Sequence, residues 1–537
     1  MKGTGGFKGL TQNPVTLHRW MLARPELTRL LQMFEDMNSI SDDRNEYQHH
    51  DEGAASQKIY LKQCKKLLAT ISEYGNPFED TCPELLVLNS RACADESVVK
   101  TIQNIRNIGQ DQFESLKEAV FVKRERVIQT PIKKNMLPLF KTPKAKKAKS
   151  EEMVASLKSN VLLCSRMFIA NQQRQGDLAE FFSHENQSYP PSLSDYGGFY
   201  TGTKSELLKI FEAVDQIESK PDCAIEDGGM LLHTIHPTGS YFKEYADEFV
   251  GYIRHQLQTV RRVDIVQDRY LESSIKNETR QNRGKGSRIK VSTSTKIPVK
   301  ANFKDFLRNS QNKKELNELL SHTVIDATFQ PTEDIYITKG ESVAHKGPGP
   351  EMKESPYEEA DVRIIVHLQH ALQSGYSNIK VRTSDTDVIV LLIGHFPNLS
   401  DSYPGTEVYV DFGSGKARRL YDIRKICEKL GRRKSRALPV FHSFTGTDTT
   451  SAFRGKGKRT AWMTWERFDE ATDAFLFIAD NPFHPVTADT SHFKTLERYT
   501  VLMYDRWAEV EQVNEARRWL FTKKGRPFDH IPPTQVS

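Results

Sequence analysis

Acidic residues gather in the stretch 357–392 at spacings that could hold a metal ion. They are Glu358, Glu359, Asp361, Asp385 and Asp387. Carboxylates brought close together repel one another unless a hard cation or a proton lies among them. Such a cluster would support metal-dependent chemistry. A structural role stays open, because acids at a helix start complement its dipole and acids after a strand form turns.

The elements that must position these acids can be predicted from the residue pattern. Apolar residues between Ala360 and Leu372 recur at the spacing of one helix face, and Gly375 ends that helix. A short β-prone run, 379–383, follows. The helix would carry acids at its start, and the strand would carry acids directly after its end. This arrangement can bring four carboxylates to one rim of a sheet.

Two earlier junctions repeat the pattern. A strand-like run at 223–226 leads to Asp227, and another at 263–266 leads to Asp268. In open α/β sheets, sites form at the carboxyl ends of the strands. Three strand ends that each carry an acid therefore indicate a shared site. Asp448 adds a further acid after a later apolar run.

Basic residues accompany the acids in two places. The first set follows Asp268 and comprises Lys276, Arg280, Arg283, Lys285, Arg288 and Lys290. The second set surrounds a Gly-x-Gly turn and comprises Arg454, Gly455, Lys456, Gly457, Lys458 and Arg459. Glycine lets another backbone or a ligand approach closely, and the cations would neutralise a phosphodiester. A solvated surface stays open as the alternative for both sets.

Composition narrows the class of protein. The 537 residues include 76 basic and 70 acidic ones, a net charge of +6, and six cysteines without CxxC spacing. This cysteine usage argues against a zinc ribbon and a disulfide scaffold. Without an apolar run of about eighteen residues or a signal-peptide core, we expect an intracellular, soluble protein without a membrane partner. The basic segment 117–150 ends in PKAKKAKS, which favours nuclear localisation over a solvated tether.

The residue pattern divides the chain into four predicted regions. They are a helical N-terminal region at 1–115, a basic linker with a helix at 116–200, an α/β core at 201–470 and a helical C-terminal tail at 471–537. Within the core, a helix is expected at 419–430, and the Gly/Pro-rich residues 339–356 are expected to form a mobile connection. His442, Trp462 and Trp465 are interpreted as packing residues.

In order and local context, the acids resemble those of the flap-endonuclease branch of the 5′-nuclease superfamily. The matching segments lie within residues 221–465 and are AIEDGG, IVQDRY, EEAD, TSDTD and FTGTD, followed by RGKGK. The resemblance implies an α/β fold with a PIN-like core, a mostly parallel central sheet and a helix–turn–helix extension, preceded by a mainly α-helical N-terminal region. ALPVFHSFTGTDTTSAFRGKGK and EEADVRIIVHLQ also resemble a group of large uncharacterised animal proteins.

The resemblance implies roles for individual residues. Seven acids would bind two Mg²⁺ or Mn²⁺ ions and serve catalysis: Asp227, Asp268, Glu359, Asp361, Asp385, Asp387 and Asp448. Lys276 and Arg280 would act as catalytic cations on the scissile phosphate. Arg283, Lys285 and residues 454–459 would contact the nucleic-acid backbone. The chain departs from the family in placing its core behind about 200 residues.

The chain is therefore expected to be a structure-selective, metal-dependent nuclease that hydrolyses phosphodiester bonds, with DNA favoured over RNA as its partner. Two alternatives stay open: a catalytically inactive nucleic-acid-binding scaffold and a PIN-type endoribonuclease. A carboxylate cluster favours catalysis, because a pure binder of phosphate would gain nothing from it. Contacts with the backbone serve either polymer, so the sequence does not separate DNA from RNA.

Overall fold

The computed structural model describes nearly all of the chain from residue 198 onward and parts of what precedes. The described residues are 26–31, 33–34, 37, 54–73, 85, 92–123, 162, 165–166, 168–170, 177–185, 189–195, 198–271, 274, 286–298 and 300–537. By its internal contacts the chain divides into two units, Met1–Glu73 and Tyr74–Ser537. In these described parts, no helix combines the length and apolar character needed to cross a membrane.

Helices dominate the described elements before residue 123. The first unit contains α3 (Ala54–Glu73). The second unit begins with α4 (Glu96–Gln103), α5 (Ile105–Lys117) and the π-helical turn η1 (Glu118–Val122). On α3, apolar side chains such as Leu61, Leu67 and Leu68 are exposed. These helices therefore build no hydrophobic core of their own among the described residues.

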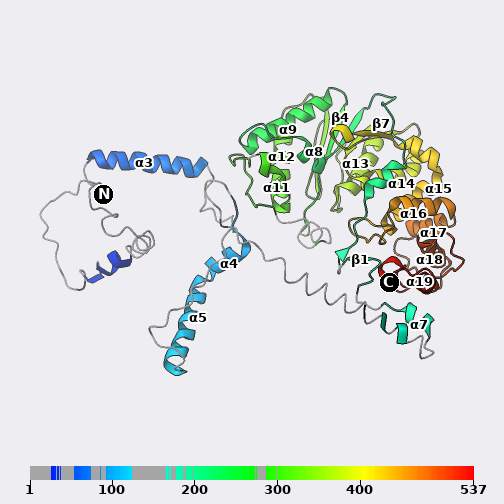
Figure 1. Cartoon of the computed structure of the whole chain (residues 1–537). Helices are drawn as coiled ribbons and strands as arrows, with labels where there is room; N and C mark the ends of the chain where they lie inside the picture. Colours follow the sequence, from blue (N-terminus) through cyan, green and yellow to red (C-terminus); the bar gives the residue numbers. More distant parts are fainter. Residues whose placement is uncertain are drawn as a thin grey trace. The chain divides into compact units, whose positions relative to one another are not determined.

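A seven-stranded sheet forms the centre of the second unit (Figure 1). Its strands are β3 (Cys223–Asp227), β4 (Arg262–Val266), β5 (Asp334–Lys339), β6 (Ser342–Lys346), β7 (Asn378–Thr383), β8 (Glu407–Phe412) and β9 (Arg419–Asp422). The strand order is β6-β5-β4-β3-β7-β8-β9. The five central strands are parallel, and β6 and β9 pair antiparallel at the two edges. The predicted α/β class with a mostly parallel sheet is confirmed.

Burial on both faces explains the sequences of the central strands. β3 and β4 are buried at every position, as expected for parallel strands that helices cover on both sides. On β3, Cys223 and Ile225 pack into one hydrophobic cluster, whereas Ala224 packs into another. The register places Asp227 beside Val266, so the carboxyl ends of β3 and β4 meet at the same edge.

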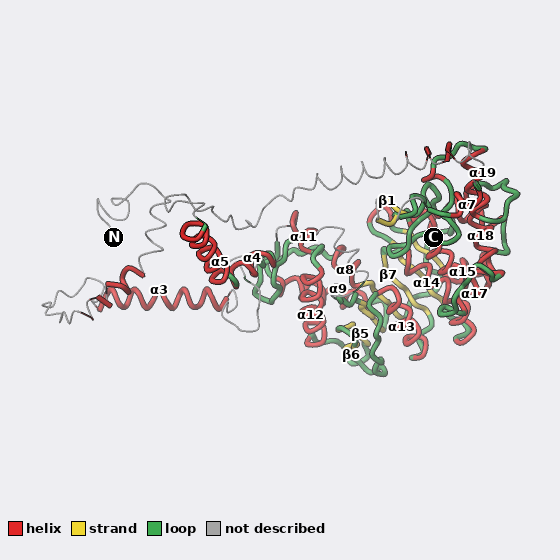
Figure 2. Tube along the Cα trace, turned by 90° about the horizontal axis from the view of Figure 1, so that it is seen from below, coloured by secondary structure: helices red, strands yellow, loops and turns green. Residues whose placement is uncertain are grey.

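Helices cover both faces of this sheet, and further helices pack outside them. They are α8 (Gly228–Thr234), α9 (Phe242–Leu257), α11 (Lys300–Phe306), α12 (Ser310–Asp326), α13 (Ala360–Gln373), α14 (Thr386–Ser402), α15 (Ile423–Phe444), α16 (Lys458–Arg467), α17 (Ala471–Asp480), α18 (Ser491–Tyr504) and α19 (Val513–Thr522). Helices α9, α11 and α12 share one cluster with β4 and β5. Helices α13 to α19 share the other with β7 and β8 (Figures 1 and 2).

Two local predictions were wrong. The helix expected at 419–430 begins only at Ile423, because the preceding residues form β9 and pair with β8. It breaks at Gly431 as expected, where φ is +76°, but a second helical segment continues to Phe444. The connection expected at 339–356 contains β6, which turns back at Gly340 and pairs with β5. In both cases the secondary structure depends on pairing with a neighbouring strand, and the sequence of the segment alone does not show that pairing.

A buried ion pair ties the sheet to α13. Arg262 and Asp264 on β4 are fully buried, and Nε and Nη2 of Arg262 lie 2.7 Å from the two carboxylate oxygens of Asp264. Nδ1 of His367, on α13, lies 2.7 Å from Oδ2 of the same carboxylate. The guanidinium also lies 4.0 Å from the centre of the Tyr336 ring. These contacts fix α13 against the sheet.

The end of the chain packs against residues 177–185, which include α7 (Leu178–Ser183). Arg517 on α19 is buried, and its Nη1 lies 2.9 Å from Oε1 of Glu185. Its Nε donates a hydrogen bond of 3.0 Å to the carbonyl of Phe182. The same Glu185 oxygen accepts from the backbone N–H of Thr534 at 3.1 Å. One carboxylate thus holds two parts of the C-terminal segment.

Candidate metal centre

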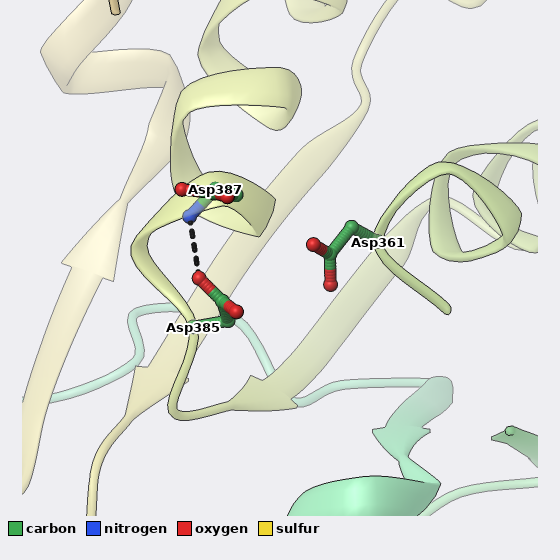
Figure 3. A group of neighbouring side chains, drawn as sticks. All are labelled: Asp361, Asp385 and Asp387. Atoms are coloured by element: carbon green, nitrogen blue, oxygen red, sulfur yellow. Dashed lines mark hydrogen bonds between the residues drawn. The ribbon is translucent and has the colours of Figure 1, made fainter. Parts of the chain in front are cut away.

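Three aspartates meet at the carboxyl edge of the sheet (Figure 3). Asp361 lies in the first turn of α13, Asp385 precedes α14 as its N-cap, and Asp387 lies in the first turn of α14. One carboxylate oxygen from each lies within 4.8 Å of the others. None of the three side chains is exposed. We call this group the aspartate trio.

Chain direction explains why the trio forms. Helix α13 runs back across the sheet before β7, so its first turn reaches the edge at which β7 ends. Helix α14 begins directly after β7, so its first turn lies at the same edge. Both helix starts carry partial positive charge, which favours nearby carboxylates. Asp385 also caps α14, because its Oδ1 accepts from the N–H of Asp387 at 3.0 Å.

Three further aspartates surround the trio. Asp227 is the last residue of β3, and its Oδ2 accepts from the Thr383 hydroxyl at 2.8 Å while its Oδ1 accepts from the Met230 N–H at 3.1 Å. Asp268 follows β4 and accepts from the N–H of Ala360, the first residue of α13, at 3.0 Å. Asp448 lies in the loop between α15 and α16. Hydrogen bonds thus fix Asp227 to the end of β7 and Asp268 to the start of α13.

Burial and like charge raise the pKa of several of these acids. Burial raises the pKa of Asp227 to about 6, and the charges of Asp268 and Asp385 add to this effect. The pKa of Asp361 lies well above its ordinary value, first because of burial and then because of neighbouring carboxylates. Burial and the charge of Asp387 likewise raise the pKa of Asp385. The group therefore carries charge repulsion that a divalent cation would relieve.

Two residues that sequence reasoning did not select complete the surroundings of Asp387. Nζ of Lys204 lies 2.7 Å from Oδ2 of Asp387 and 3.1 Å from Oδ1 of Asp448. Nε2 of His442 lies 2.9 Å from Oδ1 of Asp387. Burial would raise the pKa of Asp387, but hydrogen bonds from His442 and Lys204 outweigh it and lower the pKa.

His442 therefore differs from its interpretation as a packing residue, although it is buried. A signal was present in the sequence, since His442 lies six residues before Asp448. Lys204 gave no such signal, because 183 residues separate it from Asp387. Trp462 and Trp465 are buried and do pack, with the Trp465 ring stacked 4.6 Å from that of Phe441.

Glu359 is placed at the border of the site. It forms the N-cap of α13, two residues before Asp361. It does not belong to the trio, whose members come from the first turn of α13 and the start of α14. Neighbouring Glu358 accepts a hydrogen bond of 2.9 Å from the hydroxyl of Ser274. The pair expected from the resemblance thus contributes one residue, Asp361, to the trio.

The charged residues of the 454–459 turn mostly face the protein. Lys458 is buried and donates to the carbonyl of His442 and to the Thr445 hydroxyl, so it does not offer the expected contact with a backbone. Burial lowers its pKa to about 7. Arg454 pairs with Asp529 at 2.8 Å, and Nζ of Lys456 lies 5.0 Å from the Tyr504 ring centre. Gly455, Gly457 and Arg459 are exposed.

The predicted cations Lys276, Arg280, Arg283 and Lys285 lie outside the described residues. Other cations adjoin Asp268 in a cavity of about 310 Å³. Its lining includes Arg269, Lys314, Lys339 and Arg363. Arg363 is buried, and in the described part of the chain its Nε and Nη2 have no hydrogen-bond partner. The lining also includes Asp268, Glu318 and Glu341, so the cavity beside the acidic site carries charges of both signs.

The loop that carries Asp448 depends on Gly446. This residue has φ of +104°, and a Cβ added there would lie 2.7 Å from the Cα of Ala452. We expect Gly446→Ala to destabilise the protein by about 1–3 kcal/mol, because both the backbone conformation and the contact are unfavourable. Gly457→Ala is the matched control, since a Cβ there meets nothing within 4 Å. Urea unfolding measures both, and equal losses would contradict the expectation.

Comparison with known proteins adds distant similarities. A family model described as a domain of unknown function (DUF8702) matches residues 1–185. No curated protein matches the sequence. Solved structures of the catalytic core of Rad2 in complex with DNA substrate share 15–16% sequence identity with this chain. The matched region covers 60–61% of this chain and 94–96% of the Rad2 chains, with TM-scores of 0.29. Likeness this distant supports no inference about function.

Proposed function

We propose that this chain is a metal-dependent nuclease that hydrolyses phosphodiester bonds in nucleic acid, with DNA favoured over RNA. The observation that carries the proposal is the trio of Asp361, Asp385 and Asp387, with one oxygen of each within 4.8 Å of the others. A site whose ligands are all carboxylate oxygens suits Mg²⁺ and Mn²⁺. Burial and repulsion raise the pKa of Asp361 and Asp385, and a hard divalent cation would remove that cost.

Each acidic residue of the site then has a role in catalysis. A bound Mg²⁺ or Mn²⁺ would lower the pKa of a coordinated water and accept charge from the leaving oxygen. The trio would hold the ion, and Asp227 and Asp268 would complete the negative rim from positions that hydrogen bonds fix. The proposed nuclease belongs to the PIN-like, flap-endonuclease type, in which Glu359 and Asp448 also serve the metal centre.

Nucleic-acid contacts would come from the cations around the rim. Exposed Arg459 lies at the start of α16, and Arg269, Lys314 and Lys339 line the cavity beside Asp268. Such residues neutralise phosphates without reading bases, so they position a substrate rather than select its sequence. Lys276, Arg280, Arg283 and Lys285 stay in the proposal as predicted contacts.

The test is a cleavage assay with the full chain and Mn²⁺. End-labelled flap, duplex and single-stranded DNA, with matched RNA, are the substrates. We expect metal-dependent products from at least one DNA substrate and none in the presence of a chelator. Cleavage of RNA alone would favour the endoribonuclease, and identical results with and without metal would contradict the proposal.

A non-catalytic nucleic-acid-binding scaffold is the second candidate. Lys204 favours it, because its ammonium already neutralises part of the cluster without a metal. The two candidates differ in their response to metal. At a Mn²⁺ concentration of 100 times the dissociation constant, binding to the folded state alone adds about 2.7 kcal/mol to the free energy of unfolding. Thermal unfolding that Mn²⁺ leaves unchanged would select the scaffold.

A further inference from the structure

Lys204 places a fixed positive charge inside the acidic site. Its Nζ contacts Oδ2 of Asp387 at 2.7 Å and Oδ1 of Asp448 at 3.1 Å, and its side chain is 15% exposed. These two acids come from different elements, the start of α14 and the loop before α16. The ammonium therefore bridges the trio to the outer acid at Asp448.

The position of this lysine is built into the fold. Lys204 begins the short helix η2 (Lys204–Lys209), whose Leu207 and Leu208 are buried in the main hydrophobic cluster. Helix η2 packs against α14 and α16, which flank the site. The backbone of Lys204 is thus anchored next to the acids that its side chain contacts. A lysine on a loose surface segment would have no such support.

Both oxygens of Asp387 already have a partner. Oδ2 contacts Lys204, and Oδ1 lies 2.9 Å from Nε2 of His442. A Mg²⁺ ion binds oxygen at 2.0–2.1 Å. An ion between Asp387 and Asp448 would have to displace the ammonium, because it would take the same place between the two carboxylates and repel the ammonium, whereas an ion at the trio can use the remaining lone pairs of Asp387.

We propose that the site holds one divalent ion, at the trio, and that the Lys204 ammonium takes the place of a second ion between Asp387 and Asp448. The inference rests on the proposed metal-dependent nuclease and revises the two ions that the resemblance implied. An ammonium has three N–H donors, and this one lies within 3.1 Å of an oxygen of each of two carboxylates. The third can donate to a phosphate oxygen of the substrate, which makes Lys204 a substrate-binding cation.

The test counts Mn²⁺ ions bound to the full chain, by isothermal titration and by electron paramagnetic resonance. We expect one ion per chain in the wild type and two in Lys204→Ala, with the spectrum of a spin-coupled pair because two such ions lie about 3.5–4 Å apart. Lys204→Arg keeps the charge and should keep one ion. Lys209→Ala removes an exposed lysine of the same helix, paired with Glu206, and should bind as the wild type does.

The double variant with Asp361→Asn and Asp385→Asn is the control, because it measures how many Mn²⁺ ions bind outside the trio. A coupled pair in the wild type would overturn the inference, and so would a single ion in folded Lys204→Ala. The wild-type count decides the matter even where the alanine variant fails to fold. Failure of the proposed function gives a different result. One bound ion without cleavage would support the role of Lys204 and contradict the nuclease activity. No bound ion above the background would contradict both.

Discussion

Asp385→Asn combined with Asp387→Asn is expected to abolish metal-dependent cleavage while the protein stays folded. The two substitutions keep side-chain size and remove two of the three charges of the trio. Metal catalysis is worth several kcal/mol, and each 1.36 kcal/mol is a factor of ten, so we expect a loss of roughly 10³-fold or more in turnover. Turnover at the wild-type level would exclude the trio as the metal centre.

A second readout separates lost chemistry from lost structure. Asp385→Asn alone should unfold at a temperature equal to or above that of the metal-free wild type, because it removes charge repulsion, whereas the double variant also loses the ion pair of Asp387 with Lys204 and should unfold at a somewhat lower temperature. The double variant should also bind DNA with undiminished affinity, since it carries less negative charge. Asp469→Asn with Asp473→Asn, two exposed acids near the start of α17, is the matched control and should cleave normally.

Asp264→Asn is expected to destabilise the folded protein strongly. It would leave the guanidinium of Arg262 fully buried without its counter-charge. Removing one partner of a buried ion pair typically costs about 3–5 kcal/mol. The surface pair of Arg432 with Asp401 supplies the control, and Asp401→Asn should cost less than about 1 kcal/mol. Urea unfolding at neutral pH measures both.

The effect of Asp264→Asn should depend on pH in a defined direction. Burial acts to raise the pKa of Asp264, but Arg262 and His367 outweigh burial and hold the pKa below its ordinary value of 3.8. The folded state therefore favours the ionised carboxylate more than the unfolded state does. This stabilisation is present above the ordinary value and is lost as the pH falls below it. A difference between wild type and variant that grows on acidification would contradict the assignment.

The sequence predicted those parts of the site that depend on neighbours along the chain. Asp227, Asp268, Asp361 and Asp385 each follow a strand or open a helix, and the alternation of strands and helices brings such positions to one edge of a parallel sheet. The same local pattern predicted the α/β class. Strand β5 was missed, and with it the pairing that makes β6 a strand.

Contacts between distant segments could not be predicted in this way. Lys204 follows a short irregular stretch, and nothing nearby marks it as the partner of Asp387. Lys458 stands among exposed glycines and basic residues, a composition typical of a solvated turn, yet the loop geometry directs its ammonium to the carbonyl of His442. Periodicity reports which face of an element is apolar. It does not report which polar side chains meet once the elements pack.

Glu185 limits how the protein can be shortened or recombined. A fragment that starts at residue 201, the predicted start of the core, would lack the carboxylate that Arg517 and Thr534 share. The buried guanidinium of Arg517 would then lose its counter-charge and its bond to the Phe182 carbonyl. Fragments for crystallisation, and chimeras that exchange the C-terminal helices, should therefore always contain residues 177–185 together with residues 513–537.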